Sequence, residues 1–282
     1  MIIDNLIFEG TKILRQENIE NPMLDAELLL TIITKKERKF SIIYGREKID
    51  NKSVLKYFDL INRRKKKEPI AYILNKKEFW STNFVVDKNV LIPRPDTEII
   101  LFDIKARFKN SKRLSVLDIG TGSGCILLSI LKEFKNYRGV GLDKSKKAIN
   151  IAKFNSDLLS INNRSKFIKC DVDNYKFDQY YDLIVSNPPY ICSHKIKNLS
   201  IGIRRFEPYI ALDGGKTGLV TVNKVINKAK KILKIGGYLY LEIGYDQSRL
   251  VCQILQKNNF KVVDKLMDYN KKIRCIIGTR LK

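Results

Sequence analysis

Residues 187–190, which read Asn-Pro-Pro-Tyr, have the clearest potential for chemistry in this chain. They follow the apolar run 183–185, which predicts a buried strand, and open α/β sheets bind ligands where such strands end. Two consecutive prolines cannot continue a sheet, because neither has an N–H to donate and both hold φ at about −65°. The corner therefore offers two acceptors, the Asn187 side-chain oxygen and the Pro188 carbonyl, with the flat Tyr190 ring beside them. An NH2 group of an amide or an aminopurine could point one N–H at each acceptor, although Asn-Pro-Pro is also a common loop breaker.

A glycine-rich segment provides a second candidate site. Residues 118–124 read Asp-Ile-Gly-Thr-Gly-Ser-Gly and lie between a predicted strand at 114–117 and a predicted helix at 125–134. Glycines at such a turn let the backbone approach a ligand closely. Cys125 stands where the dinucleotide-binding pattern needs its third glycine, which disfavours a pyrophosphate at the start of this helix.

Acidic residues follow the next two predicted strands. Asp143, after the strand at 139–142, is placed to accept hydrogen bonds from both hydroxyls of a ribose. Asp171, after the strand at 166–168, is placed for an adenine amino group, with Val172 against the base. Together these signals predict an adenosine pocket without phosphates, and S-adenosylmethionine, with S-adenosylhomocysteine as product, is the expected cofactor. The alternative is a structural glycine turn flanked by surface aspartates. The expected cofactor-binding residues are Gly120, Thr121, Gly122, Ser123, Gly124, Asp143, Asp171, Val172 and Asn187, and the expected substrate-binding residues are Asn187, Pro188, Pro189 and Tyr190.

Two kinds of periodicity divide the chain. Up to about residue 70 apolar residues recur three and four apart, which predicts helices. Two stripes, Leu24-Leu28-Ile32 and Val54-Tyr57-Phe58-Ile61, are expected to form the core of a small helical bundle. The stretch 78–91 predicts a β-hairpin. We expect a helical domain at 1–75, a hairpin linker at 76–92 and a second domain at 93–282.

The second domain alternates predicted strands with helices, a pattern typical of an α/β fold with a parallel sheet covered on both faces. Further strands are expected at 182–185 and 238–243, and further helices at 146–157 and 219–233. The last two strands, near 262–263 and at 274–277, are joined by a link too short for a crossover helix. They should therefore be antiparallel.

Length and composition narrow the class of protein. The 282 residues suffice for two domains with apolar cores. No stretch of the sequence approaches the roughly 18 uninterrupted apolar residues that a membrane span needs. The start of the chain also lacks the features of a signal peptide. We therefore expect a cytoplasmic protein. The five cysteines lack C-x-x-C spacing and His194 is the single histidine. No metal is expected, and histidine-dependent acid–base chemistry is disfavoured.

The formal net charge of +24 raises the question of nucleic-acid binding, and residues 63–67 are the densest basic cluster. Lysines are nevertheless spread over almost every segment, which indicates a compositional bias with solvated faces more than a dedicated surface. The charge permits direct nucleic-acid binding without requiring it.

Taken together, residues 118–124, Asp143 and 187–190 resemble the class I, seven-strand methyltransferases that modify planar nitrogens. Within that group the chain resembles the release factor glutamine methyltransferases, often called the PrmC or HemK family. The likeness extends along nearly the whole chain, at residues 24–29, 69–73, 78–79, 90–98, 206–208, 211–212 and 214–215. There are departures: Asn75 stands where the family usually has glycine, and residues 268–274 are a loose version of the family's ending.

The resemblance implies a seven-strand, Rossmann-like, mostly parallel sheet with an antiparallel last strand, preceded by the helical domain. It implies methyl transfer to the side-chain amide nitrogen, N5, of the glutamine in the Gly-Gly-Gln loop of peptide chain release factors. Asn187, Pro188 and Tyr190 would be the catalytic residues, the helical domain would recognise the factor, and a monomer is expected. We expect Arg94 and Glu98 to lie near the substrate entrance, or each of them to belong to a buried ion pair between the domains.

Three alternatives remain open at this point. A ribosomal protein could be the glutamine substrate, or the same corner could hold a flipped adenine for N6 methylation of nucleic acid. A non-catalytic nucleic-acid-binding protein would bind no cofactor.

Overall fold

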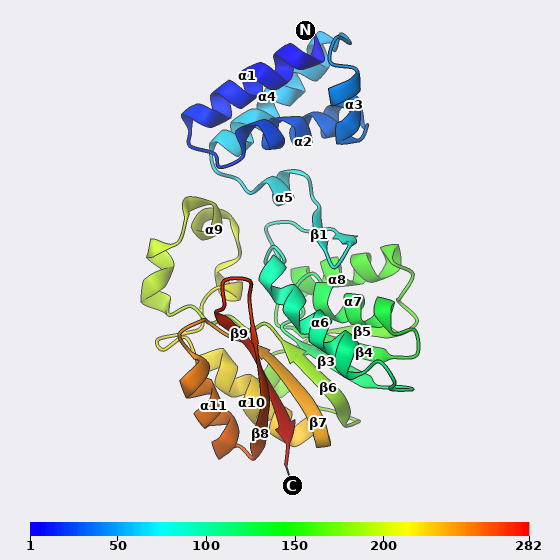
Figure 1. Cartoon of the computed structure of the whole chain (residues 1–282), viewed down its shortest axis with the longest axis vertical. Helices are drawn as coiled ribbons and strands as arrows, with labels where there is room; N and C mark the ends of the chain where they lie inside the picture. Colours follow the sequence, from blue (N-terminus) through cyan, green and yellow to red (C-terminus); the bar gives the residue numbers. More distant parts are fainter. Residues whose placement is uncertain (282) are drawn as a thin grey trace. The chain divides into compact units, whose positions relative to one another are not determined.

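The computed structural model describes residues 1–281, which cluster into two compact units (Figure 1). The first unit comprises Met1–Lys76 and Ser200–Phe206, and the second comprises Lys77–Leu199 and the described part of Glu207–Lys282. Among residues 1–281, none of the helices combines the length and apolar composition needed to cross a bilayer.

The first unit is helical. Its helices are α1 (Ile3–Gln16), α2 (Pro22–Thr34), α3 (Arg38–Ile43), α4 (Asn51–Lys65), α5 (Ile70–Ile73) and α9 (Ile201–Phe206). Pro22 occupies the first turn of α2, where its missing N–H leaves no bond unmade. Helix α4 starts at Asp50, whose side chain accepts the Ser53 amide at 3.0 Å. The α4 stripe is confirmed, since Tyr57 and Ile61 are fully buried in the core.

The expected stripe on α2 is wrong. Leu24 and Ile32 are exposed, and the buried face instead carries Ala26, Leu29 and Leu30 together with Asp25 and Glu27. The two carboxylates are buried because each pairs with an arginine, Asp25 with Arg64 at 2.6 Å and Glu27 with Arg38 at 2.5 Å. Helix α2 is apolar on nearly every side, so periodicity alone does not identify its buried face.

The hairpin is shorter than expected. Strands β1 (Lys77–Phe79) and β2 (Thr82–Phe84) pair antiparallel around Trp80 and Ser81, both at φ of 50°. Residues 85–91 lie outside strands. The reason is a side chain that replaces a strand partner: the Asn155 carboxamide accepts the Val85 N–H at 2.8 Å and donates to the Val85 carbonyl at 3.0 Å.

The second unit contains a seven-stranded sheet of order β5-β4-β3-β6-β7-β9-β8, in which β9 alone runs in the direction opposite to the other six strands. This is the expected methyltransferase architecture, and the antiparallel pairing of the last two strands is confirmed. The strands are β3 (Ser115–Ile119), β4 (Arg138–Asp143), β5 (Ser165–Lys169), β6 (Tyr181–Ser186), β7 (Leu233–Glu242), β8 (Phe260–Met267) and β9 (Ile273–Arg280).

Helices cover both faces of this sheet. One apolar core packs α6 (Glu98–Arg107), α7 (Cys125–Glu133) and α8 (Lys146–Leu158), and the other packs α10 (Val220–Ile232) and α11 (Ser248–Lys257). Short 3₁₀ turns complete the unit: η1 (Pro95–Thr97), η2 (Val172–Asn174), η3 (Ser193–Asn198) and η4 (Tyr209–Ala211). The sheet is buried on both sides because its central strands are almost entirely apolar.

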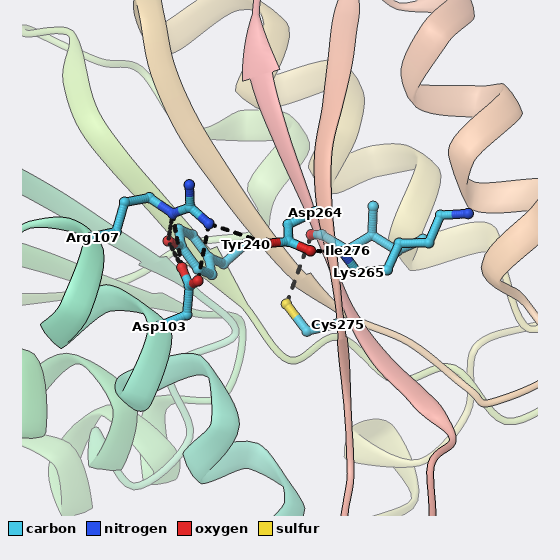
Figure 2. Close-up of polar contacts among 7 residues, drawn as sticks. All are labelled: Asp103, Arg107, Tyr240, Asp264, Lys265, Cys275 and Ile276. Atoms are coloured by element: carbon cyan, nitrogen blue, oxygen red, sulfur yellow. Dashed lines mark hydrogen bonds and ion pairs between the residues drawn. The ribbon is translucent and has the colours of Figure 1, made fainter.

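A polar network fastens α6 to the sheet (Figure 2). The buried Tyr240 hydroxyl, from β7, donates to the Asp103 carboxylate, and Arg107 Nε donates to the same carboxylate at 2.9 Å. Arg107 also reaches Asp264 of β8 at 3.4 Å. Burial raises the pKa of Tyr240 far above its usual value, and the Asp103 acceptor raises it further, so the hydroxyl stays protonated as a donor. This network fastens the second half of α6 to β7 and β8.

Candidate functional site

A cavity of about 360 Å³ opens at the carboxyl ends of the parallel strands in the second unit. Because β3, β4, β5 and β6 run in the same direction, the segments that follow them meet at one edge. The predicted site residues lining the cavity are Gly120, Thr121, Gly122, Ser123, Asp143, Asp171, Val172, Asn187, Pro188 and Pro189.

The glycine loop has a backbone that only glycine adopts readily. Gly120, Gly122 and Gly124 have φ of 78°, 55° and 82°. A Cβ at Gly120 or Gly122 would meet no protein atom within 4 Å, so their free space is available to a ligand. A Cβ at Gly124 would instead lie 3.0 Å from Leu128 and 3.3 Å from Ala152. Gly124 therefore allows α7 and α8 to pack closely, and it stays outside the cavity lining.

Asp143 connects this loop to the second strand end. Its Oδ2 accepts the Gly122 amide at 3.0 Å and its Oδ1 accepts the Ser145 amide at 2.8 Å. Burial raises the pKa of Asp143, and the two backbone hydrogen bonds lower it again. Each carboxylate oxygen keeps a second lone pair, so Asp143 can shape the loop and also accept hydrogen bonds from a ligand in the cavity.

Asp171 and Val172 form another part of the wall, at the end of β5. The Asp171 side chain caps η2 by accepting the Asp173 amide at 3.1 Å. Val172 is nearly buried and contributes an apolar surface beside it. A flat aromatic group could pack on Val172 while a polar edge faces Asp171.

The Asn-Pro-Pro-Tyr corner is held rigidly in place. Gln247 is buried and donates to the Tyr190 carbonyl at 3.0 Å and to the Gly218 carbonyl at 3.2 Å. The Tyr190 ring is half-buried behind the corner, outside the cavity lining as far as the described residues go, and its neighbours include Glu242 and the charged groups of Arg274 and Arg94. Burial raises the pKa of Tyr190 well above its usual value, and Glu242 raises it further.

Asn187 is held from the interior side. Its Nδ2 donates to the Thr97 hydroxyl at 3.4 Å. The Oδ1 atom is then the part of the carboxamide that can accept a hydrogen bond from a group in the cavity. Pro188 lines the cavity next to Asn187, so the two residues expected from the sequence to supply acceptors lie side by side there.

Arg94 and Glu98 have separate partners. Arg94 forms an ion pair with the buried Glu207 at 2.6 Å, and both residues belong to the second unit. Glu98 accepts the Trp80 amide at 2.9 Å and so supports the hairpin turn. Thr97, between them, is the residue of this segment that lines the cavity, and it was not anticipated.

Two buried carboxyls close to the cavity were not singled out from the sequence, and neither lines it among the described residues. Asp118 is 1% exposed, and its Oδ2 accepts the Thr121 hydroxyl at 2.7 Å while its Oδ1 has no hydrogen-bond partner. Glu242 is 3% exposed, and its Oε2 likewise has no partner. Each acid ends or nearly ends a sheet strand, the same signal that identified Asp143. Within residues 1–281 no group of three or more His, Cys, Asp or Glu side chains is arranged to hold a metal ion.

Burial raises the pKa of Asp118 to about 7, and nearby Asp143 adds to the shift. Since an unfolded aspartate has a pKa of about 3.9, the folded protein keeps a proton between about pH 4 and pH 7 that the unfolded chain releases. The stabilising contribution of this group is therefore complete below about pH 4 and is lost as the pH rises through 7.

Urea denaturation of Asp118→Asn tests this assignment. The unfolding free energy of the original protein should decrease from pH 5 to pH 8, and we expect a smaller decrease in Asp118→Asn. The exposed Asp157→Asn should leave that decrease unchanged, and an equal decrease in Asp118→Asn and the original protein would contradict the assignment.

Comparisons with known proteins agree with this architecture. Residues 110–277 match a family model described as a methyltransferase domain, and residues 5–74 match one described as the PrmC N-terminal domain. A release factor glutamine methyltransferase from Clostridium acetobutylicum is 36% identical over 282 residues, which covers 99% of each chain. Another from Caulobacter vibrioides is 33% identical over 267 residues, covering 95% of this chain and 92% of the relative.

Solved structures extend the likeness at the level of fold. A ribosomal protein L11 methylase from Lactobacillus delbrueckii superposes with a TM-score of 0.52 at 20% identity, covering 70% of this chain and 84% of that one. A methyltransferase from Pyrococcus furiosus superposes with a TM-score of 0.51 at 18% identity, covering 71% of this chain and 89% of that one.

Proposed function

Because this chain belongs to the family of release factor glutamine methyltransferases, we propose that it methylates the glutamine of the Gly-Gly-Gln loop in peptide chain release factors. The methyl group would pass from S-adenosylmethionine to the side-chain amide nitrogen, N5. The observation that carries this proposal is that Asn187 and Pro188 line one cavity together with the glycine loop, while the Asn187 Nδ2 is engaged by Thr97.

The residues around the cavity suit the cofactor. Open space above Gly120 and Gly122 leaves room for a ligand against the loop, and we assign the neighbouring Asp143, which lines the same cavity, to the hydroxyls of a ribose. Asp171 and Val172 offer a polar and an apolar surface for adenine. S-adenosylmethionine supplies a methyl group on a positively charged sulfur, which makes that carbon electrophilic.

The protein's part in the reaction is mainly positioning. A carboxamide nitrogen is a poor nucleophile, because its lone pair is delocalised into the carbonyl. With one N–H accepted by Asn187 and the other by the Pro188 carbonyl, the nitrogen is held in a fixed direction and its pyramidal form is favoured. The corner selects an NH2 group over a carbonyl oxygen, since neither proline has an N–H to offer. No strong base is needed, because an alkylated amide nitrogen becomes acidic and loses its proton to water or a carbonyl.

The role of Asp143 can be tested by cofactor binding alone. We expect Asp143→Ala to weaken S-adenosylmethionine binding by about 1.5–3 kcal/mol, the range for hydrogen bonds to a charged group. The loss has two sources, the ribose contact and the support that the carboxylate gives to Gly122. Isothermal calorimetry measures the affinity, with Asp157→Ala on α8 as the control expected to bind normally. An unchanged affinity in Asp143→Ala would remove Asp143 from the site.

The substrate class is tested by supplying candidate methyl acceptors one at a time. Cofactor with a labelled methyl group is offered separately to an intact release factor, to ribosomal proteins and to DNA. We expect label in the release factor. Label in DNA alone would favour adenine-N6 methylation, which suits the same corner and the charge of +24. Label in a ribosomal protein alone would redirect the proposal to that substrate.

A further inference from the structure

The end of strand β7 carries a buried acid that the mechanism above does not use. Strands β6 and β7 are parallel neighbours, with Ser186 opposite Leu241 in the register. The next residues along the two strands are Asn187 and Glu242, so the acid lies beside the amide-binding side chain. Glu242 is 3% exposed and its Oε2 has no hydrogen-bond partner.

Thr97 connects the same two side chains from a different element. Its hydroxyl accepts the Asn187 Nδ2–H at 3.4 Å, and Thr97 is itself 2% exposed. Thr97 and Asn187 are also the two side chains that approach the Glu242 carboxyl closely enough to lower its pKa by hydrogen bonding. Three side chains from three segments therefore meet behind the cavity wall.

The network that fastens the second half of α6 to the sheet limits where Thr97, just before the start of the same helix, can lie. Tyr240 and Glu242 are two residues apart on β7 and so project from the same face of the strand. Tyr240 holds α6 through Asp103 and Arg107, as Figure 2 shows, and η1 with Thr97 leads directly into α6. The contact between the Thr97 hydroxyl and the Asn187 amide is thus a consequence of how α6 packs.

The chemistry of these groups gives the Asn187 carboxamide a preferred orientation. An ionised carboxylate can only accept hydrogen bonds, whereas an asparagine amide can donate through nitrogen or accept through oxygen. Facing Glu242 and Thr97, the favourable arrangement points the NH2 group of Asn187 inward and its oxygen toward the cavity. The flipped arrangement would place the Asn187 oxygen against the Glu242 carboxylate, so two acceptors would face each other. It would also turn the Asn187 NH2 group toward the NH2 group of the substrate, so two donors would face each other.

We infer that Glu242 and Thr97 are positioning residues that hold the Asn187 carboxamide with its oxygen facing the substrate amide. The inference rests on the proposed function, since it assigns a role within the same reaction. Neither residue is assigned a contact with the transferred methyl group, so both should affect turnover more than cofactor affinity.

The positioning of the Asn187 carboxamide by Glu242 should depend on pH. Burial raises the pKa of Glu242 to about 7, while hydrogen bonding from Thr97 and the charge of Arg274 act in the opposite direction. Below about pH 7 the carboxyl gains a proton and can donate to the Asn187 oxygen, which competes with the substrate. Activity should therefore rise with pH through about 7. The other ionisable groups around Glu242 are Arg274, Asp96, Tyr190, Cys125 and Cys275.

The test compares Glu242→Gln with the original protein on an intact release factor. The neutral side chain can present its own NH2 group to Asn187 and so permits the wrong orientation. We expect kcat to fall by at least about tenfold, since misplacing a positioned group by about 1 Å can cost about 100-fold in rate. The cofactor affinity should stay within about twofold, and the rise of kcat between pH 6 and pH 8 should be smaller than in the original protein. Asp118 titrates in the same range, but it is present in both proteins, so its contribution cancels in the comparison.

A second pair of variants covers the outcome that Glu242→Gln folds poorly. Thr97→Val keeps the shape of the side chain and removes the hydroxyl, whereas Thr97→Ser keeps the hydroxyl. We expect Thr97→Val to lower kcat and Thr97→Ser to retain most of it, with thermal melting and cofactor affinity similar in both. Asp182→Asn, at the opposite end of β6, is the control for loss of a carboxylate and should keep normal turnover.

The possible results distinguish a failure of the proposed function from a failure of the positioning role of Glu242 and Thr97. If the original protein labels no release factor, the proposed function is wrong regardless of the variants. If it labels the factor, and both Glu242→Gln and Thr97→Val turn over normally, the positioning role is wrong while the proposed function stands. Equal losses of kcat in Thr97→Val and Thr97→Ser would also overturn the positioning role. The two variants differ in whether they keep the hydroxyl, so equal losses would mean that the hydroxyl does not matter.

Discussion

Replacing Asn187 with alanine is expected to abolish methyl transfer to the release factor while changing cofactor affinity far less. The substitution removes one of the two acceptors that we propose to fix the substrate amide. Removing a single group of this kind from an active site costs about 100- to 1,000-fold in turnover. Cofactor binding should persist, because the glycine loop, Asp143 and Asp171 are untouched.

Single-turnover measurements with saturating cofactor isolate the chemical step in this variant. Asn187→Asp is a useful companion. It keeps the shape of the side chain but has no NH2 group to donate to Thr97, and it would bring a second acid beside Glu242. We expect it to be strongly impaired as well. Near-normal turnover in Asn187→Ala would show that this side chain does not orient the amide.

Removing residues 1–76, which make up the first unit except for Ser200–Phe206, is expected to have the next largest effect. A glutamine side chain offers little surface, so discrimination among the glutamines of a cell must come from contacts remote from the reacting nitrogen. The helical unit has exposed apolar residues that fit such a role, among them Ile42 and Ile43 on α3, which are 66% and 67% exposed. A chain beginning at Lys77 should bind cofactor normally but lose about 100-fold in kcat/KM on the intact factor, equivalent to about 2.8 kcal/mol of transition-state binding.

Two controls accompany this truncation. Circular dichroism and cofactor titration establish that the shortened chain is folded, and the full-length variant Ile42→Ser/Ile43→Ser tests the exposed surface without removing a core. A short Gly-Gly-Gln peptide should be a poor substrate for every form, since it lacks the remote contacts. If the folded, truncated chain is as active as the full-length protein on the intact factor, the recognition role of the first unit is excluded.

Part of the candidate site could be predicted because its residues directly follow parallel strands, whose carboxyl ends meet at one edge of the sheet. Glycines at 120 and 122 and the acid at 143 follow predicted strands directly, and parallel strands bring such segments to one edge whatever the details of packing. The corner at 187–190 was predictable for the same reason, since two prolines end a strand and expose their acceptors locally. These inferences required only neighbours in sequence.

The parts that were missed depend on neighbours in space. The pairing of Glu242 with Asn187 follows from the order of β6 and β7 in the sheet, and the place of Thr97 follows from the packing of α6, neither of which leaves a local pattern. The wrong face of α2 has a similar cause. Asp25 and Glu27 look like surface residues in the sequence, and their burial depends on arginines supplied by other helices.

The central claim, that Asn187 directs methyl transfer to a glutamine amide, is tested most directly by locating the methyl group. An intact release factor is incubated with S-adenosylmethionine and either the original protein or Asn187→Ala, and its peptides are sequenced by tandem mass spectrometry. We expect one methyl group on the side-chain nitrogen of the Gly-Gly-Gln glutamine with the original protein, and no detectable methyl group with the variant within the same reaction time. A methyl group on another residue, or an unmodified factor under conditions in which ribosomal protein or DNA becomes methylated, would contradict the account.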